Sequence, residues 1–186
     1  DFYWERSRFL VNAVHDILDA AFPPSFPGIK HVVINTPARH DLAQRKALAA
    51  SLIPNVFDFD NEPPPLDEYA RDVREQLELN ADDILILQPT RVIARKGVEH
   101  SIELVRRLKD PRAKLVVSHS AGDEGLEYYQ WLRDLAQSEG VDIRFVANRL
   151  RETRKVDEGG RKIYTLWDIY PHADLISYPS LYEGFG

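Results

Sequence analysis

The feature that most constrains the fold of this chain is a repeated alternation of short apolar runs with segments of helical periodicity. The short runs are rich in β-branched residues, which is typical of strands buried in a parallel sheet. Strands that alternate with helices of about 10 to 15 residues indicate right-handed βαβ units. The sequence therefore predicts an α/β fold with parallel sheets. The predicted strands cover residues 31–35, 52–54, 84–88, 113–117, 143–147 and 174–178, and the predicted helices cover residues 4–21, 38–49, 66–79, 98–108 and 125–139.

A run of three prolines divides this pattern into two parts. Residues 55–65 combine the prolines with acidic residues, and such a segment does not form a helix or a central strand. We therefore expect residues 55–65 to be an interdomain linker between parts of two Rossmann-like domains, residues 1–54 and residues 66–186. Both ends are expected to be truncated, because the chain does not begin with Met and stops at a glycine in a turn sequence.

The composition argues against several classes of protein. Hydrophobic residues make up 44% and charged residues 29% of the 186 positions, as in ordinary soluble globular proteins. The net charge of −6 gives no reason to expect nucleic acid as a partner, and no apolar run approaches the roughly 18 residues that span a bilayer. Cysteine is absent, which excludes disulfides and thiolate metal sites, and we expect a cytoplasmic protein. The six histidines match no metal-binding spacing, so no metal site is predicted.

Charged residues follow two of the predicted strands. Arg91 and Lys96 come after the strand that ends at residue 88, and Glu183 with the turn Gly184-Phe185-Gly186 comes after the last strand. Because the carboxyl ends of parallel strands meet at one edge of a sheet, we expect these residues to lie close together. A helix amino terminus, glycines, an arginine fork and a lysine ammonium group together suit a diphosphate. Glu183 could bind sugar hydroxyls or stabilise positive charge on an anomeric carbon.

Each of these features also has an ordinary interpretation. A Lys-Gly pair before a helix is usually a solvated helix start, Gly-Phe-Gly is usually a turn, and an arginine after a strand is often a surface residue. The conjunction of all three, in this order and each after its own strand, is what indicates a binding site. His119 follows the strand at 113–117 at the same edge, where both a surface role and a ligand contact remain open.

Three further features carry expectations of their own. Thr36 precedes Pro37, and we expect it to cap the helix predicted at 38–49. Trp131 and Trp167 have helical spacing and are predicted to be core residues. The basic segment 149–162 surrounds a Gly-Gly pair and is predicted to be a solvated hairpin insertion. Its alternative role is a contact to a charged acceptor, to a partner, or to lipid headgroups as a peripheral membrane contact.

Two stretches of the chain resemble the carboxyl-domain signature of the group 1 glycosyltransferases, also called family 4. One is Arg91 followed after four residues by Lys96-Gly97, and the other runs from Tyr170-Pro-His-Ala-Asp to Pro179-Ser-Leu-Tyr-Glu-Gly-Phe-Gly. Residues 53–58 resemble, less specifically, the domain-crossover segment of that family, and residues 1–6 resemble a stretch near its cleft. The family has the two-domain GT-B fold. The resemblance implies that residues 1–54 belong to the acceptor-side domain and residues 66–186 to the nucleotide-sugar domain.

The resemblance also implies an activity. A hexosyltransferase of this family moves a sugar from a nucleoside diphosphate sugar to a hydroxyl of a sugar, lipid or small-molecule acceptor. It does so with retention of anomeric configuration and without a required metal or other cofactor. The residues that match Arg91 and Lys96 neutralise the donor diphosphate, and the one that matches Glu183 lies near the transferred sugar, so these three are the catalytic candidates. A second glutamate of the family would fall at position 191, beyond residue 186.

Further donor contacts are implied by the same resemblance. In the family the amides of the Gly-Phe-Gly turn contact phosphate or sugar. The nucleobase usually lies near the loop after the third strand of the domain, which corresponds to residues 146–149. The donor-binding candidates are therefore Arg91, Lys96, Gly184, Phe185, Gly186, His119, Asn148 and Arg149.

The chain departs from the family pattern at two loops. Thr90 stands where the family commonly has a glycine before the arginine, and residues 118–122 stand where it commonly has several glycines. These changes leave the charges in place but alter the expected loop geometry. Two alternatives therefore remain open beside sugar transfer. One is a nucleotide-sugar epimerase or phosphorylase on the same architecture, and the other is a non-catalytic module that binds a nucleotide or another protein.

Overall fold

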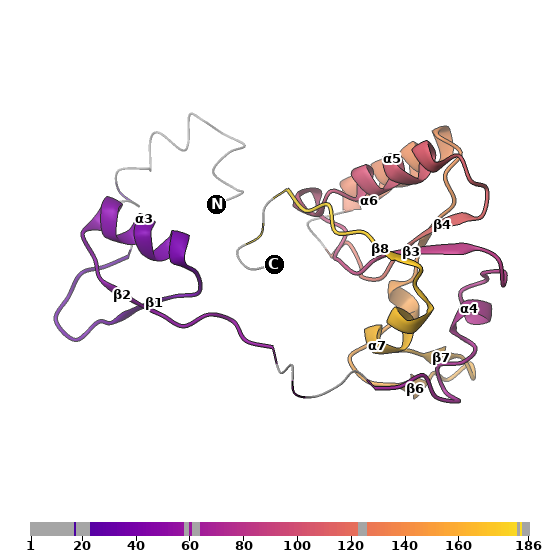
Figure 1. The fold of residues 1–186 in the computed structure, drawn as a ribbon, viewed down its shortest axis with the longest axis horizontal. Helices are drawn as coiled ribbons and strands as arrows, with labels where there is room; N and C mark the ends of the chain where they lie inside the picture. Colours follow the sequence, from indigo (N-terminus) through magenta and orange to yellow (C-terminus); the bar gives the residue numbers. More distant parts are fainter. Residues whose placement is uncertain are drawn as a thin grey trace. The chain divides into compact units, whose positions relative to one another are not determined.

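Figure 1 shows the fold of the computed structural model, which describes residues 17, 23–57, 60, 64–122, 126–181 and 183. The described residues divide into two compact units, one ending at Phe57 and the other running from Asp60 to Glu183. The helix predicted at 4–21 lies outside the described residues except for Ile17, and part of the predicted linker also lies outside them. The assignment of the two units to an acceptor-side and a nucleotide-sugar domain stays a prediction.

The first unit contains a βαβ crossover. Strand β1 (His31–Val33) pairs in parallel with β2 (Ala50–Leu52), and helix α3 (Thr36–Lys46) connects them. The parallel pairing agrees with the prediction, but the burial does not, because Val32 of β1 is 54% exposed. A parallel strand is buried when helices cover both faces of its sheet. Within the described part of this unit, α3 is the one helix that packs on the pair.

Helix α3 is capped by Asn35. The side-chain oxygen of Asn35 accepts a hydrogen bond from the amide of Ala38 at 2.8 Å, which satisfies one of the free amides of the first turn. Thr36 is already helical, so its prediction as the cap is wrong by one residue. Pro37 lies in the first turn, where its missing N–H removes no helical hydrogen bond.

The second unit is built on a four-stranded sheet in which all strands are parallel. The strand order is β5-β4-β3-β8, and helices α5 (Val98–Leu108) and α6 (Leu126–Ser138) are the crossovers from β3 to β4 and from β4 to β5. Strand β8 lies on the side of β3 opposite to β4, so the winding reverses between β3 and β8. Open α/β sheets bind ligands at such a reversal, beyond the carboxyl ends of the strands. The strands are β3 (Ile84–Gln88), β4 (Ala113–Val117), β5 (Ile143–Phe145) and β8 (Leu175–Ile176).

Alternate residues of the central strands build two cores, one on each face of this sheet. Ile86 and Leu115 pack with α5 and α6, whereas their neighbours Leu85 and Val116 pack with α4 and α7 on the other face. Figure 1 shows α5 and α6 on one side of the strands and α4 and α7 on the other. All four side chains are fully buried, which explains why these runs are apolar throughout. The two short helices are α4 (Val73–Gln76) and α7 (Leu166–Ile169).

The helix predicted at 66–79 is mostly replaced by turns, and α4 is its one helical piece. The carboxylate of Asp67 accepts hydrogen bonds from the amides of Tyr69 and Ala70, both at 3.0 Å, and so fixes a turn. The hydroxyl of Tyr69 then donates to the carbonyl of Lys155 at 2.7 Å. Hydrogen bonds from this segment to distant residues of the same unit therefore decide its structure, and the local helical periodicity does not.

The segment 149–162 contains a hairpin, as predicted. Arg154 fastens its base to the body of the unit. The Arg154 guanidinium donates to the carboxylate of Asp67 at 2.6 Å and to the buried carboxylate of Asp168 at 2.9 Å. The hairpin therefore has a defined position on the second unit. Its strands are β6 (Lys155–Val156) and β7 (Lys162–Ile163), which pair in antiparallel fashion.

Candidate functional site

Two loops interlock where the winding of the sheet reverses. The loop after β3 contains a short 3-10 helix, η1 (Ala94–Lys96), and the amide of Leu181 in the loop after β8 donates to the carbonyl of Arg95 at 2.9 Å. Gly97 then begins α5 with a φ of 62°, a conformation that favours glycine. A Cβ atom on Gly97 would lie 2.6 Å from the carbonyl oxygen of Pro179. The two loops therefore share one edge of the sheet, as the sequence predicts.

Lys96 and Glu183 meet at this edge. The Lys96 ammonium group hydrogen-bonds one carboxylate oxygen of Glu183, although the two residues are 87 positions apart in the sequence. The ammonium group also lies 5.3 Å from the centre of the Tyr178 ring. Arg95 donates to the other carboxylate oxygen at 3.0 Å. Two cations thus converge on one carboxylate from adjacent positions of the same short helix.

The electrostatics of this cluster keep Glu183 ionised. Burial by itself raises the pKa of the Glu183 carboxyl, but the side chains of Lys96, Ser180 and Arg95, in that order of effect, outweigh it and lower the pKa to about 2. The three side chains therefore carry two positive charges and one negative charge near neutral pH. A surplus positive charge at the carboxyl edge of a parallel sheet is suited to an anionic ligand.

Arg91 and His119 lie on neighbouring loops. The amide of Val92 donates to the carbonyl of Ser120 at 3.2 Å and so ties the loop after β3 to the loop after β4. The pKa of His119 is lowered, mainly by burial and also by the positive charge of Arg91. The Ser118 hydroxyl lies 2.6 Å from Nδ1 of the His119 ring and fixes its orientation. A neutral histidine held in this way offers a hydrogen bond without adding charge.

The departure from the family pattern at Thr90 has a structural explanation. Thr90 is buried, and its hydroxyl accepts a hydrogen bond from Nε2 of the fully buried Gln88 at 3.2 Å. The same Nε2 donates to the carbonyl of Lys96 at 2.9 Å and so holds η1 in place. Thr90 does not have a positive φ, so this chain has no conformational need for glycine there. The hydrogen bond from Gln88 fixes the side chain of Thr90 at this position of the loop.

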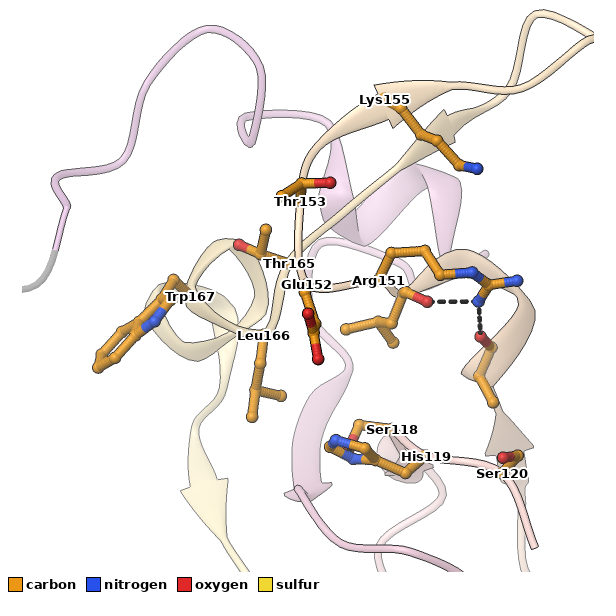
Figure 2. Close-up of a pocket in the computed structure, with 12 residues that line it drawn as sticks. Ser118, His119, Ser120, Arg151, Glu152, Thr153, Lys155, Thr165, Leu166 and Trp167 are labelled. Carbon is orange, nitrogen blue, oxygen red and sulfur yellow. Dashed lines mark hydrogen bonds between the residues drawn. The ribbon is translucent and has the colours of Figure 1, made fainter. Parts of the chain in front are cut away.

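A cavity of about 790 Å³ opens near the carboxyl ends of β4 and β5. His119 contributes to one wall, and residues of the insertion and of α7 contribute to the others (Figure 2). Among them are Arg151, Glu152 and Trp167. The Arg151 guanidinium is held by the carbonyls of Ala147 and Leu150 at 2.9 and 2.5 Å, shown as dashed lines in Figure 2. The cavity wall therefore combines fixed charge with an aromatic ring.

Of the described donor-binding candidates, His119 lines this cavity, whereas Arg91 and Lys96 do not. Asn148 and Arg149 lie in the short helix η3 (Ala147–Arg149), and neither lines the cavity. The Arg149 guanidinium instead donates to Oε1 of Gln76 at 2.6 Å. Their donor-binding role stays a prediction. Gly184, Phe185 and Gly186 lie outside the described residues, and the same holds for their predicted contacts.

Several residues at the site were not among the candidates predicted from the sequence. Arg95 directly precedes Lys96. This pair of adjacent basic residues is the sequence signal that could have indicated Arg95 as a site residue. Arg151 and Glu152 belong to the insertion, whose path over the sheet cannot be read from its composition. Trp167 is 40% exposed and Trp131 is 48% exposed, so the prediction that they are core residues is wrong.

Within the described residues, no three His, Cys, Asp or Glu side chains are grouped as they would be around a metal ion. No helix in that same part of the chain is long and apolar enough to cross a bilayer.

Named proteins are similar to this chain in sequence. No family model matches the chain. Two relatives are called mannosylglucosylglycerate synthase. The one from Petrotoga mobilis is 33% identical and the one from Thermotoga maritima is 32% identical, and both alignments cover 100% of this chain. The chain spans 47% and 45% of the two relatives, which is just under half of their length.

A solved structure is similar in fold. HepE of Anabaena, in complex with UDP-glucose, matches with a TM-score of 0.61 over 93% of this chain and 43% of that chain. Its sequence identity is 16%, so the likeness concerns the fold alone. It confirms the predicted fold class, an α/β chain with parallel sheets, and is consistent with GT-B-like Rossmann parts.

Proposed function

We propose that the protein is a glycosyltransferase that moves a sugar from a nucleoside diphosphate sugar to an acceptor hydroxyl. The observation that carries the proposal is the meeting of Lys96 and Glu183, 87 residues apart in sequence, at the carboxyl edge of a parallel sheet. Open α/β sheets bind ligands at this edge. The name of the two relatives supports the same reaction class, because mannosylglucosylglycerate contains two joined sugars.

The donor diphosphate binds, in this proposal, against Arg91 and Lys96, with Glu183 beside the transferred sugar. The interlocked loops support this placement, since they hold the side chains of Lys96 and Glu183 together. The nucleoside part enters the cavity of about 790 Å³ beside His119. That volume lies within the range of roughly 300 to 1,000 Å³ that is usual for small-molecule sites.

Charge development explains why these residue types are needed. When the bond between the anomeric carbon and the diphosphate breaks, negative charge grows on the leaving phosphate and positive charge grows on the sugar. Lys96 and Arg91 stabilise the first charge and Glu183 stabilises the second. For retention, the acceptor hydroxyl attacks the face that the phosphate leaves, and a phosphate oxygen takes its proton. No metal ion takes part in the proposed reaction.

The name of the two relatives indicates which donor sugar and which acceptor to propose. A mannosyl group is the outermost part of mannosylglucosylglycerate, so we propose a mannosyl donor and a glucosylglycerate acceptor. Such an acceptor carries a carboxylate and therefore needs a positive partner outside the donor site.

Thermal denaturation of the full-length protein tests the donor class. A sugar nucleotide that binds only the folded state stabilises it by about 2.7 kcal/mol at one hundred times its Kd. UDP-, GDP- and ADP-linked mannose and glucose are to be compared. We expect at least one of them to raise the Tm. The rise should disappear in Lys96→Ala and persist in Arg107→Ala, which changes an exposed arginine paired with Glu103 on α5.

Product analysis with a labelled donor separates this proposal from its rivals. Label in a new glycosidic product supports transfer. A free epimer of the sugar nucleotide, or cleavage that depends on added phosphate, would instead indicate an epimerase or a phosphorylase. If no sugar nucleotide raises the Tm, the proposed function is wrong.

A further inference from the structure

The Glu183 carboxylate is shared between two cations that have different surroundings. Lys96 holds one oxygen, and its side chain is 10% exposed. Arg95 holds the other oxygen at 3.0 Å, and its side chain is 29% exposed. Each oxygen therefore has its own cationic donor, so one cation can leave while the other remains.

Donor binding creates a conflict at this cluster. A lysine ammonium group is a compact charge that would turn toward a diphosphate placed beside it. Glu183 would then face a multiply charged anion with less compensation, and like charges at such distances repel strongly where water is excluded. A carboxylate that must stay beside the transferred sugar thus needs a second positive partner.

Arg95 has the geometry for this task. Its planar guanidinium holds a carboxylate in a fixed direction. Its carbonyl also accepts the hydrogen bond from the amide of Leu181 at 2.9 Å. The main chain of Arg95 therefore anchors the loop that carries Glu183, and the side chain anchors the carboxylate itself. Substitution of the side chain leaves the main-chain anchor in place.

We propose that Arg95 is a positioning residue that holds the Glu183 carboxylate beside the sugar when Lys96 turns to the donor diphosphate. This inference rests on the proposed function and deepens it. Arg95 contacts Glu183 and not the phosphate, so it contributes to the reaction step more than to donor binding. Lys96 contributes to both.

The two roles predict different kinetic behaviour in the full-length enzyme. In Arg95→Ala, we expect kcat to fall by about tenfold to a hundredfold, while the Kd for the nucleoside diphosphate changes by less than about threefold. In Lys96→Ala, both nucleotide binding and kcat should fall. Arg95→Lys should restore part of kcat, because it restores the charge without the fork. Arg107→Ala, an exposed arginine on α5, should match the unchanged enzyme.

The pH profile separates positioning from a general structural role. Lys96, Ser180 and Arg95 together lower the pKa of Glu183 to about 2 against the effect of burial. Removal of Arg95 takes away one of these three contacts and so raises that pKa, while Lys96 and Ser180 remain. The acid limb of kcat/KM should therefore move to higher pH in Arg95→Ala, and Arg95→Lys should move it back.

Specific outcomes would overturn the inference. A loss of nucleotide binding in Arg95→Ala as large as in Lys96→Ala would make Arg95 a phosphate ligand instead. An unchanged kcat or an unmoved acid limb in Arg95→Ala, with activity lost in Lys96→Ala, would remove the positioning role and leave the proposed function standing. Normal turnover in both Lys96→Ala and Glu183→Ala would overturn the proposed function and this inference together.

Discussion

At the scale of single residues, Gly97 carries two constraints at once. Its φ of 62° begins α5 in a left-handed conformation, and its missing Cβ leaves room for the carbonyl of Pro179. The first constraint is local and the second joins the loops after β3 and β8. The position of Lys96, one residue earlier, depends on both.

Gly97→Ala should destabilise the protein more than a comparable change elsewhere. The added methyl group would meet the Pro179 carbonyl at 2.6 Å in addition to the strain of a positive φ, so we expect a loss of more than about 2 kcal/mol. Gly160→Ala is the matched control, because its φ is 76° and no atom lies within 4 Å of the added carbon. The control should lose about 1 kcal/mol. Equal losses in urea unfolding would show that the contact with Pro179 is unimportant.

At the scale of elements, the sequence predicts best where both faces of a strand are buried. Strands β3 and β4 have the bounds expected from their apolar runs, because burial on two sides requires an unbroken run. Helices α5 and α6 also agree closely with prediction. The helix expected at 66–79 fails because Asp67 bonds to Arg154 and Tyr69 bonds to the carbonyl of Lys155, partners that the local pattern does not contain. Element type is thus readable where packing is two-sided, and unreadable where distant side chains decide.

The hairpin offers a prediction at this scale. Arg154→Ala removes the link to Asp67 and leaves the nearly inaccessible Asp168 carboxylate with fewer donors. We expect a loss of about 2 kcal/mol in the free energy of unfolding. Arg161→Ala is the control within the same hairpin, since its partner Asp157 is a local and exposed pairing. It should cost far less. Similar unfolding curves for the two variants would contradict the role of Arg154 as the fastener.

At the scale of the whole molecule, the shifted groups predict how stability depends on pH. The pKa of His119 is lowered from 6.5 by burial and by Arg91. The pKa of Asp168 is lowered from 3.8, because hydrogen bonds from Arg154 and Thr165 outweigh the opposing effect of burial. In each case the unfolded chain binds a proton more readily than the folded chain, so stability falls as the pH falls.

Urea unfolding between pH 7.5 and pH 3 should therefore show two stages. The free energy of unfolding should begin to decline below about pH 6.5, through His119, by at most about 1.4 kcal/mol per pH unit. It should decline more steeply below about pH 4, through the aspartates. His119→Asn should remove the first stage and keep the second. An identical slope between pH 6.5 and pH 5 in both proteins would contradict the assignment to His119.

The residues of the candidate site likewise differ in whether they could be predicted from the sequence. Lys96 and Glu183 lie in the loops that follow β3 and β8, and parallel topology brings these two loops to one edge. Arg95 could not be assigned, because its direction depends on the 3-10 turn of η1. Arg151 and Glu152 reach the cavity only because the hairpin is fastened across it. Residues set by topology are predictable, and residues set by the path of an insertion are not.

The separation of Lys96 from Glu183 has a consequence during synthesis. A ribosome that adds about 5 to 20 residues per second needs roughly 4 to 17 s to extend the chain by the 87 positions from Lys96 to Glu183. Throughout that interval the lysine has no carboxylate beside it, and Gly97 has no Pro179 carbonyl to accommodate. The nascent chain can build β3, α5 and β4 first, but the anion-binding edge closes only when β8 emerges and takes its place beside β3.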